Sequence, residues 1–142
     1  MSWEKDINEL RKRENLAEKM GGEEKLKRQK DNNRLNVRER INLLFDKNSF
    51  HEFGKIAGKA QYNENGELEN FTPSNFVMGK GKINGKDVVV GGDDFTVRGG
   101  AADASIAQKQ IMAEQLANEF RLPLIRLIEG TGGGGSVKSL DM

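Results

Sequence analysis

The sequence predicts an α/β fold that begins with a charged helical arm. Three observations lead to this fold class. The first 47 residues are dense in charge and contain no proline. Further on, Asn84-Gly85 separates two strand-like runs, which is the strongest short-range signal for a β-hairpin. A helix-length segment then lies between two apolar runs, and the order strand, helix, strand favours a parallel strand pair.

Three helices are expected in the arm. The first begins after Ser2, a residue type that caps helices, and ends at Gly21-Gly22. The second covers residues 23–33, and as a short polar helix it needs a neighbour to be stable. The charges of the arm are interpreted as solvated helix faces. Asn36 caps the third, over residues 37–45. Its buried stripe is expected to be Val37, Ile41 and Leu44. The arm should therefore pack on another part of the protein.

The second part of the chain carries the strands. A short extended segment lies between Phe50 and Phe53, and a polar loop with Asn65-Gly66 and Pro73 as turn signals follows. Residues 76–83 and 86–90 are expected to pair as a hairpin, because both central residues of an Asn-Gly turn adopt positive φ. The run Val88-Val89-Val90 is typical of a strand that is covered on both faces.

A long helix and a further strand complete the expected elements. The helix should begin near Asp103 or Ser105, and residues 124–128 predict a second inner strand after Pro123. The apolar positions of the helix spread over a wide arc, so it is expected to be substantially buried. These positions are Ile106, Ile111, Met112, Leu116 and Phe120.

Composition excludes several classes of protein. The 23 Lys and Arg nearly balance the 22 Asp and Glu, and acids interrupt the basic residues of the arm, so no nucleic-acid partner is expected. Without cysteine there is no disulfide scaffold and no thiolate metal site, and no metal is expected. No apolar run is long enough to span a membrane, and the N-terminus does not resemble a signal peptide. A cytoplasmic location is therefore expected.

Glycine is unevenly distributed and gathers at a candidate anion site. Five glycines precede Gly79 and twelve lie from Gly79 onward. Residues 130–135 (GTGGGG) follow a predicted strand and precede a helix-like start, where converging backbone N–H groups bind anions. The same residues formally match the dinucleotide fingerprint, and a flexible linker is a further alternative. A phosphate-binding P-loop is excluded, because Ser136 stands where it needs lysine.

No side chain of the sequence is identifiable as catalytic. His51 is the single histidine and is interpreted as a surface residue. Asp93 and Asp94 are neighbours in a strand, so their side chains should point to opposite faces. Ser105 is interpreted as a helix cap, with no histidine placed to activate it. Any chemistry would therefore depend on backbone N–H groups.

Four segments, in this order, match the motifs of one protein family. They are residues 38–52 (RERINLLFDKNSFHE), 79–90 (GKGKINGKDVVV), 94–101 (DFTVRGGA) and 129–138 (EGTGGGGSVK). Together they resemble the carboxyltransferase (β) subunits of biotin-dependent acyl-CoA carboxylases of the propionyl-, acetyl- and methylcrotonoyl-CoA carboxylase type. The similarity covers roughly residues 9–142.

The resemblance implies a crotonase-like (ClpP/crotonase) fold, a spiral of ββα units, here incomplete and preceded by the helical arm. Residues 1–47 would be that arm, and residues 48–142 the first part of a truncated carboxyltransferase N-terminal domain. In this family a thioester carbonyl lies against backbone N–H groups, and the enolate formed at the α-carbon takes the carboxyl group from carboxybiotin. Carried over to this chain, the N–H groups that face the acyl-CoA would be those of Thr131, Gly132, Gly133, Gly134 and Gly135, with Gly99, Gly100 and Lys138 in support.

The resemblance also implies partners and leaves alternatives open. Biotin would arrive on a biotin carboxyl carrier protein, loaded by a biotin carboxylase subunit, and the full-length protein would be a homo-oligomer. Gly134-Gly135 replace the family's usual Ala-Arg, so the role of that arginine is lost or moves to Lys138. The chain would be the N-terminal part of a carboxyltransferase, inactive alone. The alternatives are a non-catalytic CoA- or subunit-binding fragment and a component of a related acyl-CoA decarboxylase.

Overall fold

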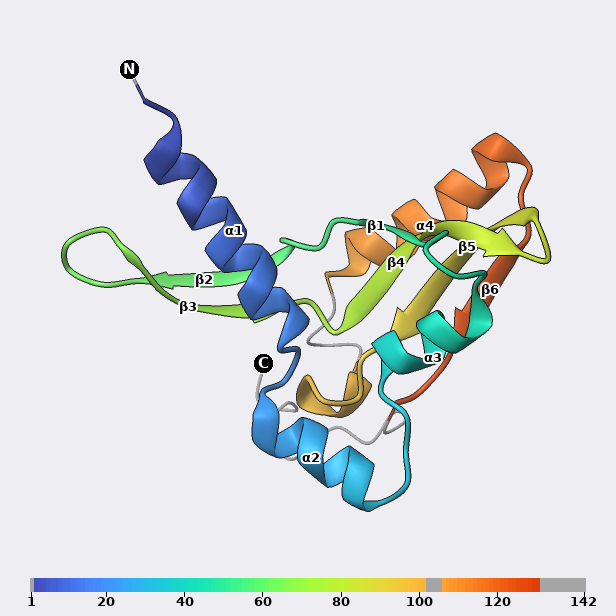
Figure 1. Ribbon diagram of the computed structural model, residues 1–142, viewed down its shortest axis with the longest axis horizontal. Coiled ribbons are helices and arrows are strands. Elements are labelled where there is room, and N and C mark those ends of the chain that lie inside the picture. The colour runs from blue at the N-terminus through green and yellow to red at the C-terminus, as the bar shows by residue number, and fades with distance from the viewer. Residues whose placement is uncertain (1, 102–105, 131–142) are drawn as a thin grey trace.

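The computed structural model describes residues 2–101 and 106–130, and its centre is a four-stranded sheet (Figure 1). The helices are α1 Glu4–Glu18, α2 Glu23–Asp31, α3 Val37–Leu44 and α4 Ala107–Phe120, with the short 3-10 helix η1 Arg98–Gly100. The strands are β1 His51–Phe53, β2 Gly58–Tyr62, β3 Leu68–Pro73, β4 Phe76–Ile83, β5 Lys86–Asp93 and β6 Leu124–Leu127. The order in the main sheet is β1-β4-β5-β6, antiparallel except for the parallel pair β5 and β6.

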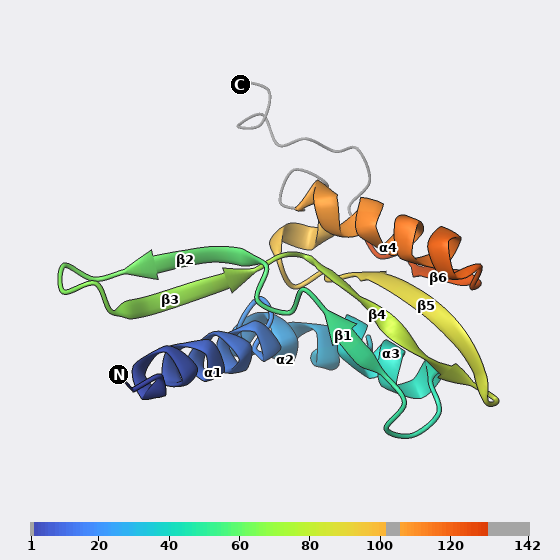
Figure 2. The ribbon, with the colours of Figure 1, turned by 90° about the horizontal axis from the view of Figure 1, so that it is seen from above.

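The central hairpin forms as the sequence predicts. Asn84 (φ 50°) and Gly85 (φ 77°) join β4 to β5, and both adopt the positive φ that the tight turn requires. Side chains of β5 alternate between two cores. Val88 and Val90 pack with α3 on one face, and Val89 packs with α4 on the other. Figure 2 shows the resulting order of layers, with α4 and α3 on opposite sides of the sheet.

The helix α4 packs through small residues, which corrects the predicted burial of its large apolar positions. Ala113 and Ala117 are buried against Phe76, Met78 and Val89. Ile111, Met112 and Phe120 are exposed by 46, 47 and 58%. Small side chains let the helix axis approach the sheet, whereas the expectation was based on the wide arc over which the large apolar residues spread. The helix begins at Ala107, with Ile106 as its N-cap; Asp103 and Ser105 lie outside the described residues.

The three helices of the arm are confirmed, with one change at the first cap. Trp3 rather than Ser2 is the N-cap of α1, and the Ser2 hydroxyl accepts a 3.3 Å hydrogen bond from the Glu4 N–H. Asn36 and Glu39 form a complete capping box at α3. Val37 and Ile41 are buried in the same core as Val88 and Val90, so the chain's own sheet is what α3 packs on.

The sequence predicts a polar loop between β1 and β4, and this prediction is wrong. The segment forms a second hairpin. Strands β2 and β3 pair antiparallel and lie beside α1 in both views (Figures 1 and 2). Glu9 of α1 accepts a 3.0 Å hydrogen bond from the Tyr62 hydroxyl, and Lys12 donates to the Leu68 carbonyl. The hairpin was missed because its strands carry mostly polar residues, so no apolar alternation marks them.

The strand β6 is at an edge of the described sheet rather than inside it. It pairs parallel with β5, as the strand–helix–strand order predicts, in the register Val89 with Leu124 to Gly92 with Leu127. All of its residues are half-buried, and Ile128 beyond it is 73% exposed. None of the helices within the described ranges is long and apolar enough to cross a membrane.

Enlarging the contact face of α4 should destabilise the protein more than trimming its outer face. In Ala113→Leu the added side chain would meet the ring of Phe76 and the side chain of Val89, so we expect a loss of about 1–3 kcal/mol in the free energy of unfolding. The matched control Ile111→Ala, on the exposed face, should change it by less than about 0.5 kcal/mol. Urea unfolding followed by circular dichroism measures both; equal losses would contradict this account of α4.

Candidate functional site

The carboxyl ends of β5 and β6 meet in one place, which is where open α/β sheets bind ligands. Asp93, the last residue of β5, accepts a 3.3 Å hydrogen bond at Oδ2 from the N–H of Glu129, just after β6. Its other carboxylate oxygen lies 3.7 Å from the Arg126 guanidinium. Asp93 therefore joins the two strand ends and fixes the position of Glu129, just after β6.

Backbone with positive φ follows β5 and contacts that same segment. Arg98, Gly99 and Gly100 have φ values of 50, 65 and 67°, a conformation that costs a residue with a Cβ roughly 1–2 kcal/mol. A Cβ on Gly100 would lie 2.2 Å from the carbonyl oxygen of Glu129. Glycine at position 100 thus meets two requirements at once, the left-handed backbone and the close approach of two chain segments.

A buried hydrogen-bond cluster holds the start of the segment that follows β5 and connects it to the arm. Asp94 accepts hydrogen bonds at Oδ1 from the Thr96 hydroxyl (2.6 Å) and the Thr96 N–H (2.9 Å). The Thr96 hydroxyl in turn accepts the N–H of Gly21 at 2.9 Å. Burial raises the pKa of the Asp94 carboxyl, and the hydrogen bonds from Thr96 partly oppose that shift. The Thr96 hydroxyl therefore links the arm, through Gly21, to the Asp94 carboxylate at the end of β5.

Two helices of the arm also reach Glu129. Its carboxylate accepts a 3.4 Å hydrogen bond from the Gln29 side-chain amide of α2 and lies 3.6 Å from the Arg40 guanidinium of α3. Glu129 is therefore held from three directions, by β5, α2 and α3. The site is built from both halves of the chain.

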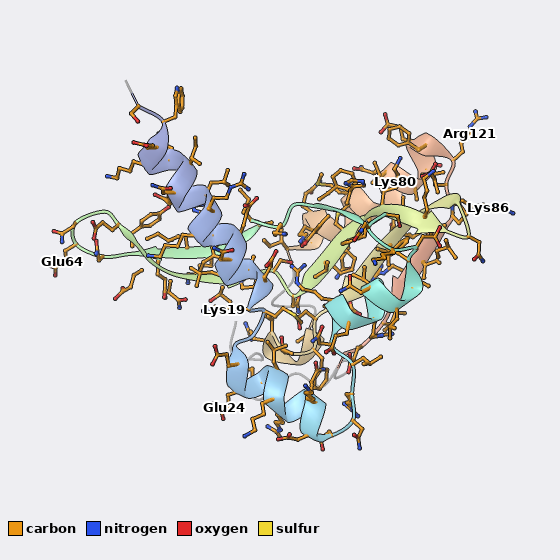
Figure 3. All side chains as sticks on the ribbon, viewed as in Figure 1. Lys19, Glu24, Glu64, Lys80, Lys86 and Arg121 are labelled. Atoms are coloured by element: carbon orange, nitrogen blue, oxygen red, sulfur yellow. The ribbon has the colours of Figure 1, made fainter. Side chains whose placement is uncertain are left out.

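A cavity of about 730 Å³ opens between α2 and η1, beside the positive-φ backbone. Figure 1 shows α2 and the η1 segment facing one another at the lower side of the molecule. Among the residues that the structure describes, four cationic side chains and no Asp or Glu line it, and Glu24 of the same helix points outward (Figure 3). The guanidinium of Arg34 lies 5.8 Å from the centre of the Phe95 ring. The lining residues are Lys25, Arg28, Gln29, Asn32, Arg34, Phe95, Thr96, Arg98 and Gly99.

The structure places some of the predicted site residues and leaves others outside its described ranges. Gly99 and Gly100 lie beside Glu129 and the cavity. His51 is an exposed residue of β1, and Asp93 and Asp94 have separate partners, as interpreted from the sequence. The other predicted substrate-binding residues lie outside the described residues: Thr131, Gly132, Gly133, Gly134, Gly135 and Lys138.

The basic lining of the cavity was missed because the charges of α2 were interpreted as a solvated helix face. Lys25, Arg28, Gln29 and Asn32 follow the spacing i, i+3, i+4 and i+7, which places them on one side of a helix. That spacing was available in the sequence as a signal. Within the described parts of the chain, no three His, Asp or Glu residues come together as a metal site.

A buried ionic cluster lies where α4 begins, near β1. The guanidinium of Arg38 makes two hydrogen bonds to Glu52, of 2.7 and 3.0 Å. Lys109 of α4 is 5% exposed, and its side chain lies 3.4 Å from the position a Cβ on Gly54 would take. Burial lowers the pKa of Lys109 to about 8, and the nearby Glu52 carboxylate partly opposes this.

The fold defines an α/β protein in which two parallel strands, β5 and β6, end near the cavity between α2 and η1. Residues 28–140 match the model of the carboxyl transferase domain family, and the chain belongs to that family. The solved structure of transcarboxylase 12S, with methylmalonyl-coenzyme A and methylmalonic acid bound, superposes with a TM-score of 0.76 at 25% identity. The match covers 92% of this chain and 26% of that one, and it confirms the expected crotonase-like fold class.

Curated relatives agree with this family. The probable methylcrotonoyl-CoA carboxylase beta chain of Drosophila melanogaster is 34% identical over 137 residues, 96% of this chain and 23% of the relative. The methylmalonyl-CoA decarboxylase subunit alpha of Veillonella parvula is 31% identical over 121 residues, 85% of this chain and 24% of the relative. The chain spans about a quarter of the length of the curated relatives it matches.

A methyl group added at Gly100 should destabilise the folded protein, because it would clash with the Glu129 carbonyl oxygen. We expect Gly100→Ala to lower the free energy of unfolding by more than about 2 kcal/mol, since backbone strain and a carbonyl clash add. Gly66→Ala is the control: its φ is 74°, but a Cβ there meets nothing within 4 Å, so strain alone should cost about 1 kcal/mol. Equal losses in urea unfolding would show that the close approach is not a constraint.

Lys109 should make the stability depend on pH in the alkaline range. Its pKa is about 8 in the folded protein and is usually 10.5, so between these values the unfolded chain binds more protons. Stability should therefore rise from about pH 8 to 10.5, by up to an order of 3 kcal/mol, and this rise should disappear in Lys109→Met. Urea midpoints across pH 7–10.5 measure it, with Lys27→Met as an exposed control; an unchanged slope in Lys109→Met would contradict the assignment.

Proposed function

We propose that this protein is the acyl-CoA-binding N-terminal part of a carboxyltransferase that moves a carboxyl group from carboxybiotin to the α-carbon of an acyl-CoA. The family match over residues 28–140 is the observation that carries the proposal. The solved transcarboxylase 12S, which shares the fold, holds methylmalonyl-coenzyme A, and this supports a CoA thioester as the substrate class.

The chemistry assigned to the chain is binding and orientation of the thioester. The N–H groups of residues 131–135 would donate to the thioester carbonyl, and the same donors would stabilise the enolate as negative charge develops on that oxygen. Because Gly100 has no side chain, the segment that follows β5 can approach the Glu129 carbonyl closely. Fixed N–H donors need no titratable side chain, which agrees with the absence of an identifiable catalytic side chain in the sequence.

Biotin and the protein partners belong to the same proposal. When bound, carboxybiotin would supply the carboxyl group that is transferred to the α-carbon of the acyl-CoA. A biotin carboxyl carrier protein, a biotin carboxylase subunit and assembly into a homo-oligomer are proposed from the family membership. Transcarboxylase 12S assembles as a hexamer, which supports the last of these. A cytoplasmic location stays a prediction, and the Drosophila relative is named as a mitochondrial protein.

A second candidate is a component of an acyl-CoA decarboxylase. The similarity to the methylmalonyl-CoA decarboxylase subunit alpha favours it, since carboxylation and decarboxylation run through the same enolate. The two candidates predict the same ligand for this chain. They differ in the direction of carboxyl transfer, which assays of carboxylation and of methylmalonyl-CoA decarboxylation by the whole protein would distinguish.

Ligand selectivity tests the proposed function on the chain itself. We expect isothermal titration calorimetry to detect binding of propionyl-CoA and acetyl-CoA to the 142-residue chain, and no binding of NAD⁺ under the same conditions. The reason is that the glycine segment is proposed to hold a thioester carbonyl rather than a dinucleotide. Binding of NAD⁺ without binding of either thioester would overturn the proposal in favour of the dinucleotide alternative.

A further inference from the structure

Asn75 is a buried polar residue that the register of the central hairpin places across the end of β5. Phe76, the first residue of β4, is fully buried and pairs with Asp93 of β5. Asn75 precedes Phe76 and stands opposite Asp94, and its backbone carbonyl accepts a 2.8 Å hydrogen bond from the Asp94 N–H. Asn75 is itself only 2% exposed. It therefore belongs to the closely packed part of the fold, although it lies outside the four motif segments of the sequence.

The side chain of Asn75 reaches the other end of the segment that follows β5. Its Nδ2 donates a 2.7 Å hydrogen bond to the Ala101 carbonyl. One residue therefore holds both ends of residues 94–101, the start through its backbone and the end through its side chain. Between the ends, the Gly100 N–H donates to the Val97 carbonyl at 3.1 Å. A segment that is held at both ends and bonded within itself has few conformations open to it.

The segment held in this way contains the backbone that contacts Glu129. Gly99 and Gly100 have positive φ values of 65 and 67°, and they immediately precede Ala101. At Gly100 the backbone approaches the Glu129 carbonyl so closely that a Cβ would lie 2.2 Å from that oxygen. Because Ala101 follows Gly100 directly, the hydrogen bond to the Ala101 carbonyl restrains the backbone that lies against Glu129.

We propose that Asn75 is a positioning residue for the binding of the acyl-thioester. Its hydrogen bond to the Ala101 carbonyl holds Gly100 against Glu129, and Glu129 leads into the glycine segment that is proposed to bind the thioester carbonyl. This inference rests on the proposed function for the identity of the ligand. Asn75 acts through the backbone rather than by touching the ligand, and a displaced N–H donor loses hydrogen-bond strength steeply.

Two ligands that differ only at the thioester test the assignment. Propionyl-CoA carries the thioester carbonyl and free CoA lacks it, so a loss of positioning should weaken mainly the binding of propionyl-CoA. By calorimetry on the 142-residue chain, we expect Asn75→Ala to weaken propionyl-CoA binding by about tenfold and CoA binding by less than about twofold.

Ser74→Ala is the matched control for these titrations. Ser74 is the neighbouring residue and is also buried, but its hydroxyl has no hydrogen-bond partner within the described residues. Removing that hydroxyl should therefore change the affinity for either ligand by less than about twofold.

Amide hydrogen exchange, followed by NMR without any ligand, locates the effect in the structure. In Asn75→Ala we expect the N–H groups of Gly100 and Ala101 to exchange about tenfold faster relative to the Val89 N–H in β5. Asn75→Asp has nearly the same shape but no N–H donor when ionised, and it should act in the same way. In the unaltered protein, one side-chain N–H of Asn75 should exchange slowly, a measurement that requires no variant to fold.

The outcomes separate this inference from the proposed function. If propionyl-CoA binds and Asn75→Ala leaves its affinity unchanged, or weakens CoA equally, the positioning role fails and the proposed function stands. Equal acceleration at Val89 and Gly100, or rapid exchange of both side-chain protons of Asn75, would also overturn the inference. If no acyl-CoA binds while exchange responds as expected, the hold of Asn75 on the segment stands, but the proposed function and the thioester role both fail.

Discussion

The burial of β5 on both faces is the constraint on which the rest of the structure depends. Val89 and Val90 are fully buried, one against α4 and the other against α3, so the two helices are held at a fixed distance across one strand. Close approach continues at the end of the strand: a Cβ on Gly91 would lie 2.5 Å from the Phe76 ring, and one on Gly92 would lie 2.5 Å from Val37. Such close packing on both faces leaves little freedom for the strand to shift. The residues that follow β5 are therefore attached to a strand whose position is fixed by packing.

That rigidity is transmitted to the candidate site through polar contacts. Asp94 and Thr96 hold the chain just after β5, and Asp93 holds Glu129 just after β6. Gly100 then lets the two segments approach each other. A site that binds through fixed donors needs such support, because a small displacement of a donor weakens a hydrogen bond steeply. The helical arm adds to it, since Gln29 and Arg40 orient the same glutamate, so the arm belongs to the site as well as to the core.

Comparison with the sequence shows which signals were sufficient. Local chemistry was sufficient at the Asn84-Gly85 turn and at the Asn36 cap, because a few neighbouring residues determine those conformations. Predictions failed where the structure of a segment depends on the element that it packs against. The helix α4 buries Ala113 and Ala117 rather than its largest apolar residues, and the polar strands β2 and β3 pair beside α1 without an apolar pattern of their own. The domain boundary at residue 47 stays a prediction, and α3 shares its core with the sheet beyond that boundary.

The sequence by itself determined the α/β class, the central hairpin, the parallel strand pair and the family, because each depends on local patterns or on motifs that keep their order along the chain. The position of glycine beside the site was also visible in its uneven distribution. Only the tertiary structure decided that α2 faces η1, so that Lys25 and Arg28 line one cavity with Phe95 and Gly99. The physical reason is distance: these residues are about 70 positions apart in the sequence, and no local rule relates a charge on a helix to a loop that the folded sheet brings beside it.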